Sequence, residues 1–244
     1  MKIALVSGAY KGLGFALCKQ LALYGYSVIL TAKDQIKANN AASAIEKETG
    51  VKVYPKALEV TNELEISELA TWVRNEFGKI DLIINNAGVN PKDYSDKTKM
   101  AKAYYLDSLD AQELMEVIHI NSIAPLLVVK HFRSLLNQSE KSMVINISSW
   151  LGSVSNLSFG GHYGYVGSKN LLNIFNKSMA NELKADEIIS VNVNPGWVQT
   201  DMGGSKAQFT SDEAANNILN HIVLKIQIAD SGKFLNFDGS EHPW

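Results

Sequence analysis

Lys2-Ile3-Ala4-Leu5-Val6-Ser7-Gly8-Ala9-Tyr10-Lys11-Gly12-Leu13-Gly14 opens the chain, and this stretch decides the fold. The apolar run 2–6 predicts a short buried strand, and helical spacing over 15–24 predicts a helix directly after the glycines. A strand, a glycine-rich turn and a helix in this order let the backbone approach a phosphate group. A tight turn without a ligand would use the same glycines, so the loop alone is a weak signal.

The rest of the chain repeats the alternation of strand and helix. Strands are predicted at 27–31, 51–54, 80–84, 143–147, 188–193 and 234–237, and helices at 35–49, 62–77, 109–136, 163–183 and 211–228. This alternation predicts an α/β fold with a Rossmann-like, doubly wound parallel sheet of about seven strands in the order 3-2-1-4-5-6-7, with helices on both faces. We expect a single domain over 1–244, with the polar stretch 90–107 as a surface insertion.

Composition narrows the classes of function. Hydrophobic residues make up 46% of the 244-residue chain and the net charge is −2, so no basic surface predicts binding to nucleic acid or an anionic membrane. Cys18 is the only cysteine, which excludes a disulfide within the chain and a cysteine metal site. The five histidines have no ligand spacing, and we expect no metal. No segment predicts a membrane span, so we expect a cytoplasmic protein.

Charged residues near the glycine-rich turn bear on the choice of dinucleotide. An acid about 20 residues after the turn commonly binds the adenosine ribose, whereas a basic residue binds a 2′-phosphate. Asp34 falls near that offset but is better placed to cap the next helix. Lys33 beside it and Lys11 in the turn favour NADP(H) over NAD(H). The alternative is that both lysines are merely solvated.

The candidate catalytic residues lie on the helix predicted at 163–183 and on the strand before it. Tyr165 and Lys169 are four residues apart, so they share a helix face, and the ammonium should lower the pKa of the phenol from about 10. Such a phenol is a general acid or base. Ser149 ends the preceding strand and can bond a carbonyl oxygen. Tyr163 is the weaker tyrosine, because Gly167 is the residue four positions on.

Pro125 lies inside the helix predicted at 109–136. Proline has no N–H, so the carbonyl oxygen of Asn121 loses its usual helical donor and becomes free to hold a water molecule. A harmless kink is the alternative.

These motifs together resemble the short-chain dehydrogenase/reductase family over nearly the whole chain. Ser7-Gly8 to Gly14 is similar to the family's T-G-x-x-x-G-x-G turn, with Ser in place of Thr, and Asn85 to Gly88 is similar to N-N-A-G. The resemblance identifies Asn121, Ser149, Tyr165 and Lys169 as a catalytic tetrad, with Ser149 preferred over Ser148. The segment 195–204 and the ending 232–244 resemble the branch of C-factor and sniffer-like carbonyl reductases.

The resemblance implies an NADP(H)-dependent oxidoreductase that transfers hydride between the nicotinamide and a small carbonyl or alcohol substrate. Lys169 would also hold the nicotinamide ribose, and Trp150, Phe159, His162 and Trp197 would line the pocket. The implied cofactor-binding residues are Gly8, Tyr10, Lys11, Gly12, Leu13, Gly14, Lys33, Glu59, Val60, Asn86, Ala87, Gly88, Tyr165, Lys169, Pro195, Gly196, Val198 and Thr200. Glu59 departs from the family's usual Asp. A homodimer or homotetramer is expected, and the alternative function is a dinucleotide-binding regulatory or signalling protein with little turnover.

Overall fold

The computed structural model describes residues 1–244, and its seven strands form one parallel sheet in the order β3-β2-β1-β4-β5-β6-β7. This order is the predicted one. Strands β2 and β3 lie on one side of β1 and β4 to β7 on the other, and this change of side between the parallel strands β1 and β4 opens the crevice at the carboxyl edge. The strands are β1 (Lys2–Val6), β2 (Tyr26–Ala32), β3 (Val53–Ala57), β4 (Leu82–Asn85), β5 (Met143–Ile147), β6 (Ile189–Asn194) and β7 (Phe234–Asn236).

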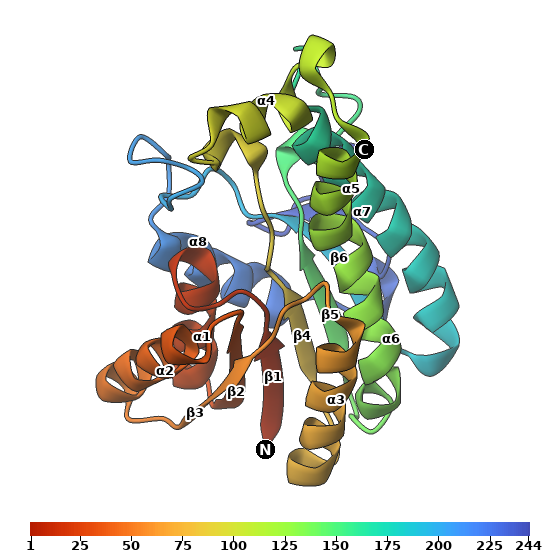
Figure 1. Cartoon of the computed structure of the whole chain (residues 1–244). Coiled ribbons are helices and arrows are strands. Elements are labelled where there is room, and N and C mark those ends of the chain that lie inside the picture. The colour runs from red at the N-terminus through yellow and green to blue at the C-terminus, as the bar shows by residue number, and fades with distance from the viewer.

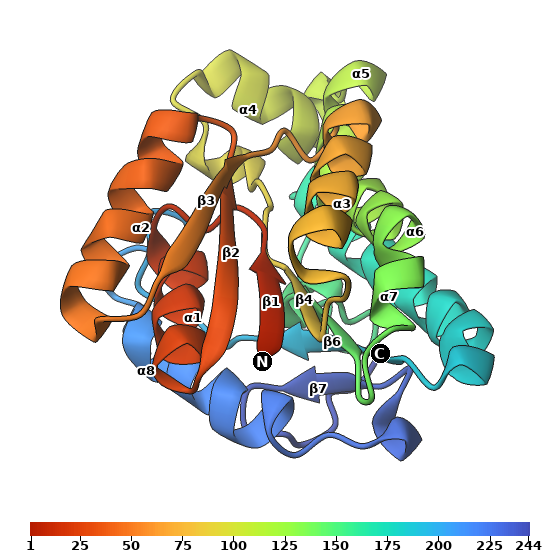
Figure 2. The ribbon, with the colours of Figure 1, turned by 90° about the horizontal axis from the view of Figure 1, so that it is seen from below.

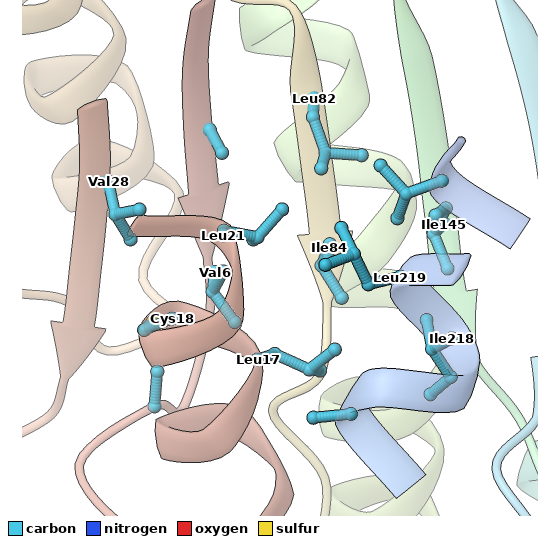
Figure 3. Close-up of a cluster of buried hydrophobic side chains, with 14 of the residues drawn as sticks. Val6, Leu17, Cys18, Leu21, Val28, Leu82, Ile84, Ile145, Ile218 and Leu219 are labelled. Atoms are coloured by element: carbon cyan, nitrogen blue, oxygen red, sulfur yellow. The ribbon is translucent and has the colours of Figure 1, made fainter. Parts of the chain in front are cut away.

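Helices cover both faces of the sheet (Figures 1 and 2). One face carries α1 (Gly12–Leu23), α2 (Gln35–Thr49) and α8 (Ser211–Ile218), and the other carries α3 (Glu63–Phe77), α6 (Ala124–Leu136) and α7 (Tyr163–Leu183). Each layer has its own apolar cluster, and Figure 3 shows α1 and α8 packing onto the central strands through Leu17 and Ile218. This burial is the main favourable contribution to folding.

Local signals set the ends of two of these helices. The Asp34 carboxylate accepts hydrogen bonds from Ile36 N and Lys37 N at the start of α2, as the capping interpretation predicted. Gly50 and Gly78 end α2 and α3 in the left-handed region, with φ of 71° and 73°. Asp34 is therefore engaged as a helix cap.

The helix predicted at 109–136 is interrupted. It consists of α5 (Ala111–Ile118), a π-helical turn η3 (His119–Ile123) and α6. The Ala124 N–H bonds the carbonyl of His119, five residues back, and Pro125 has no N–H, so the regular α-helical ladder is broken next to Asn121. Apolar periodicity cannot distinguish an α turn from a π turn, and the same holds for η6 (Leu219–Val223), which follows α8.

The joined helix Ala111–Leu136 also differs from the expectation of no membrane-spanning candidate. Its mean hydropathy of 1.2 and its length pass the criterion for a membrane span. Phe132, Leu135 and Leu136 are buried in the cluster that α6 forms with α3 and α7, and 39% of the apolar window is buried, so packing accounts for part of the apolar composition.

The polar insertion is folded and packs on the catalytic region. It contains η1 (Pro91–Asp93), α4 (Lys97–Tyr104) and η2 (Leu106–Ser108), and Figure 1 shows α4 beyond the carboxyl ends of the strands. Ala103 of α4 is fully buried, and a Cβ on Gly164 of α7 would lie 3.2 Å from the Ala103 Cβ. The expectation of a surface insertion therefore missed a close contact with α7. Short 3-10 turns η4 (Trp150–Gly152), η5 (Lys184–Asp186) and η7 (Ile228–Asp230) complete the chain.

Candidate active site

The glycine-rich turn forms a cradle between β1 and α1. Gly8 and Gly12 have φ of 61° and 58°, and a Cβ on Gly8 would lie 2.8 Å from the Ala87 Cα. The first turn of α1 has no acidic residue, and its N-cap Lys11 makes no side-chain capping bond. The N–H groups at this helix end therefore point to a site suited to an anionic group such as a pyrophosphate.

Ser7 ties this turn to the segment after β4. Its hydroxyl oxygen accepts hydrogen bonds from Asn86 N and Ala87 N, each 3.0 Å long. The Asn86 amide donates back to the carbonyl oxygens of Ser7 and Gly8 at 2.9 and 3.0 Å. The sequence identifies Ser7 only as the counterpart of the family's Thr, although a hydroxyl directly before the first glycine is a signal for this role.

The four tetrad candidates come together at the carboxyl edge of β4 and β5. Tyr165 and Lys169 lie on one face of α7, with Nζ 5.7 Å from the ring centroid of Tyr165. Ser149 follows β5, and its side chain interacts with Tyr165. Tyr163 is 39% exposed whereas Tyr165 is 7% exposed, so the helix separates the two tyrosines as predicted from their spacing.

The electrostatics of this pair differ from the prediction. Burial raises the pKa of Tyr165 to about 12, and the interaction with Ser149 lowers it only in part. Burial also lowers the pKa of Lys169 to about 8. The expected lowering of the phenol pKa by Lys169 is wrong for this structure, because desolvation dominates the pKa of Tyr165 and the ammonium is turned to Ile147, where Nζ donates a 2.7 Å hydrogen bond to the carbonyl.

Asn121 holds the segment after β4 through its side chain. Oδ1 accepts from Val89 N at 2.8 Å, and Nδ2 donates to Val89 O and to the Ser168 hydroxyl, both at 2.9 Å. A Cβ on Gly88 would lie 3.2 Å from Asn121 Oδ1 and 3.7 Å from Lys169 Nζ. Only glycine leaves this space open beside the lysine.

The two serines after β5 have different surroundings. The Ser148 hydroxyl is fully buried and donates to Asn173 Oδ1 at 2.8 Å. The Ser149 hydroxyl accepts from Leu151 N at 3.2 Å, and its other interaction is with the Tyr165 side chain, so no buried backbone or amide oxygen takes its proton. This geometry favours Ser149 as the group that bonds a carbonyl oxygen.

The lysines predicted to hold a 2′-phosphate lie at exposed ion pairs. Lys11 pairs with Asp201, and Lys33 pairs with Glu59. Both Lys11 and Lys37 lie over the Tyr10 ring, at 5.2 and 5.3 Å from its centroid. Sequence reasoning missed Lys37, which lies in the first turn of α2, four residues after Lys33. Val60, next to Glu59, is buried in the apolar cluster on the α3 side of the sheet.

The segment after β6 closes the other side of the crevice. The Asn194 side chain, which sequence reasoning missed, accepts from Gly196 N and Trp150 N at 3.2 Å each, which joins the segments after β5 and β6. Gly196 has φ 79° after Pro195, and Val198 forms a bridge with Phe209. A Cβ on Gly12 would lie 3.1 Å from Thr200 Cγ2, so Thr200 reaches the glycine-rich turn.

The predicted pocket-lining residues divide into two groups. Trp150, Phe159 and Trp197 are exposed, as expected for the rim of an open site. His162 differs, because only 5% of it is exposed and it packs inside the protein. The structure contains no group of three His, Cys, Asp or Glu side chains that could hold a metal ion.

A parallel sheet with a glycine-rich cradle and a buried Ser–Tyr–Lys group at its carboxyl edge defines an NAD(P)-dependent oxidoreductase. Residues 2–211 match the short chain dehydrogenase family, and the chain belongs to this family.

Known proteins show the same relationship. The chain is 31% identical to the C-signal of Myxococcus xanthus, over 68% of this chain and 94% of that protein. It is 32% identical to the 3-oxoacyl-[acyl-carrier-protein] reductase FabG of Escherichia coli, over 82% of this chain and 75% of that protein.

Among solved structures, carbonyl reductase Sniffer of D. melanogaster has a TM-score of 0.87 at 26% identity and covers 100% of this chain and 99% of its own. The NADPH-bound carbonyl reductase from chicken fatty liver has a TM-score of 0.86 at 28% identity, with both chains fully covered. The fold is that of the carbonyl reductases.

Proposed function

We propose that the protein is an NADP(H)-dependent carbonyl reductase in which Tyr165 is the general acid. The observation that carries the proposal is the joint burial of Tyr165 and Lys169 beside Ser149, under the glycine-rich cradle. A carbonyl reductase bound to NADPH has the same fold, which supports the same cofactor here. The substrate would be a small aldehyde, ketone or quinone.

Each part of the cofactor would be bound by a different segment of the chain. The N–H groups at the start of α1 suit the pyrophosphate, and Gly88 leaves room beside Lys169 for the nicotinamide ribose. The Pro195–Thr200 segment would flank the nicotinamide, and Lys11 and Lys33 would bind a 2′-phosphate. When bound, NADPH supplies the hydride that is added to the carbonyl carbon.

Protein groups act on the carbonyl oxygen. The Ser149 hydroxyl donates a hydrogen bond that orients it and offsets its growing negative charge. The pKa of Tyr165, about 12, keeps the phenol protonated at neutral pH, so it can give its proton to that oxygen. Lys169 stabilises the phenolate that remains, and the Asn121 amide holds the Val89 backbone against the site. In the reverse direction Tyr165 takes the proton.

The experiment is a screen of aldehydes, ketones and quinones with NADPH, followed at the nicotinamide absorbance. Saturable oxidation of NADPH by at least one carbonyl class is the expected result. If none reacts while NADPH binds, the reductase assignment is wrong.

The alternative is a dinucleotide-binding signalling protein with little turnover. The observation that favours this alternative is the sequence similarity to the protein named C-signal. Binding of NADPH without turnover would support it over the reductase. We further propose a cytoplasmic location and association into dimers or tetramers, which cell fractionation and light scattering would test.

A further inference from the structure

An aromatic stack joins the insertion to the candidate catalytic tyrosine. The His162 ring lies between two phenol rings: its centroid is 4.8 Å from Tyr104 at an interplanar angle of 29°, and 5.3 Å from Tyr165 at 18°. These distances and angles are those of offset-stacked rings. Tyr104 is the last residue of α4, so the insertion reaches Tyr165 through a single intervening side chain.

The His162 ring is held in one orientation. Its Nε2 lies 2.7 Å from Asn90 Oδ1, and the same oxygen accepts from Lys92 N at 3.1 Å. Because the backbone N–H of Lys92 identifies this atom as the amide oxygen, Nε2 must carry the proton and donate it. The hydrogen bond therefore fixes the proton on Nε2, and burial lowers the pKa of the ring to about 4, so the ring is neutral near pH 7 while it stacks with Tyr104 and Tyr165.

The backbone around His162 is also constrained. His162 has φ 60°, in the left-handed region that non-glycine residues rarely adopt, and its N–H donates to the Tyr104 carbonyl at 2.8 Å. A Cβ on Gly161 would lie 3.2 Å from that carbonyl oxygen. A strained residue kept in place by several contacts is a common feature of functional sites.

We propose that His162 is a positioning residue that holds the Tyr165 ring in its reactive orientation, and that the insertion forms part of the active site through it. The stack restricts rotation of the Tyr165 side chain about its Cα–Cβ and Cβ–Cγ bonds, so the phenol hydroxyl stays directed at Ser149. The expected effect of His162 on turnover rests on the proposed reductase function, whereas its effect on the position of the Tyr165 ring does not.

The test compares two substitutions at this position. His162→Asn keeps a residue that tolerates positive φ and removes the ring, whereas His162→Phe keeps a ring and loses the hydrogen bond to Asn90. We expect kcat of His162→Asn to fall on the order of 10-fold or more, with the Kd for NADPH unchanged, because misplacement of a catalytic group slows chemistry. His162→Phe should recover most of that loss. His131→Asn, which makes the same change on the surface of α6, is the control.

A second readout is independent of turnover. In protein labelled with ¹³C at tyrosine Cζ, the Tyr165 resonance is identified by its absence in Tyr165→Phe. Loss of the neighbouring ring current should shift this resonance in His162→Asn and leave it near its original position in His162→Phe.

An unshifted resonance, or equal kcat losses in both variants, would overturn the positioning role. If the unmodified protein reduces no carbonyl, the proposed function fails, and the resonance still decides the role of His162.

Discussion

The Lys169 ammonium donates a 2.7 Å hydrogen bond to the Ile147 carbonyl at the end of β5. This bond directs Nζ to the strand end and leaves it 5.7 Å from the ring centroid of Tyr165. The lysine is therefore held on the side where the crevice opens over Gly88 and Asn121. Tyr165 stays protonated through burial, with a pKa of about 12.

Tyr165→Phe should abolish most of the reductase activity, because it keeps the ring and removes the proton donor. We expect kcat to fall by roughly 10²-fold or more while NADPH still binds. Tyr163→Phe is the matched control two residues away, on the exposed side of α7, and should stay within about 3-fold of the unmodified protein. Steady-state kinetics and fluorescence titration of NADPH measure both effects. The reverse pattern would show that the wrong tyrosine had been assigned.

The two directions of the reaction should depend on pH in opposite ways. Reduction needs the protonated phenol, which is the dominant form below a pKa of about 12, so its kcat should change little between about pH 6 and 8. Alcohol oxidation needs the phenolate, so its rate should rise with pH over the same range. Initial rates in both directions across buffered solutions provide the check. A reduction rate that falls steadily from pH 6 would mean that the phenol ionises far below its pKa in this structure.

The sheet order could be predicted because it depends on periodicity, whereas Asn121 was assigned to the site only through the resemblance to the short-chain dehydrogenase/reductase family. The Tyr165–Lys169 spacing places both side chains on one helix face whatever their surroundings. The pKa of Tyr165 could not be predicted in this way, because it depends on how deeply later packing buries the phenol. The contact of Ala103 with Gly164 and the stack on His162 arise between segments about 60 residues apart, which no local pattern encodes.

His162 should make the protein less stable in acid. Burial, with a smaller effect from Lys92, lowers its pKa from 6.5 to about 4. Between these values the unfolded chain binds more protons, so stability rises with pH and is lost as pH falls from 6.5 through 4. The loss should reach roughly 2–3 kcal/mol near pH 4. Urea unfolding gives the free energy of unfolding of the unmodified protein and of His162→Asn at each pH in this range. The difference between the two curves isolates the contribution of His162, because both proteins have the same carboxylates. Parallel curves would contradict it.

Gly14 and Gly167 should respond oppositely to alanine, although both lie in helices. A Cβ on Gly14 would lie 2.5 Å from Asn86 Nδ2 and 2.8 Å from Ala9 Cα, so Gly14→Ala should destabilise the protein and weaken dinucleotide binding. Gly167 has nothing within 4 Å of that position, and Gly167→Ala should stabilise by up to about 1 kcal/mol. Thermal unfolding separates the two. Equal stabilisation would show that α1 and the segment after β4 are not in close contact.

The ion pairs of Lys11 with Asp201 and of Lys33 with Glu59 predict which substitutions lower the preference for NADPH over NADH and which raise it. A 2′-phosphate makes charge-assisted hydrogen bonds with lysine that NADH cannot make, each worth about 1.5–3 kcal/mol when well formed. Because both lysines are largely exposed, we take the lower end and expect Lys11→Ala and Lys33→Ala each to weaken NADPH about 10-fold and NADH little.

Glu59→Gln should have the opposite effect. It removes the carboxylate that pairs with Lys33 and that would repel a 2′-phosphate, so NADPH should bind more tightly with NADH unchanged. Lys19→Ala, on the same helix as the glycine-rich turn but paired with Glu48 and Asp212, is the matched control. Fluorescence titration gives the dissociation constants of both cofactors for each variant. Equal losses of affinity for NADH and NADPH in the lysine variants would show that these lysines hold the common part of the dinucleotide. An unchanged dissociation constant for NADPH in Glu59→Gln would show that Lys33 is not in contact with the phosphate.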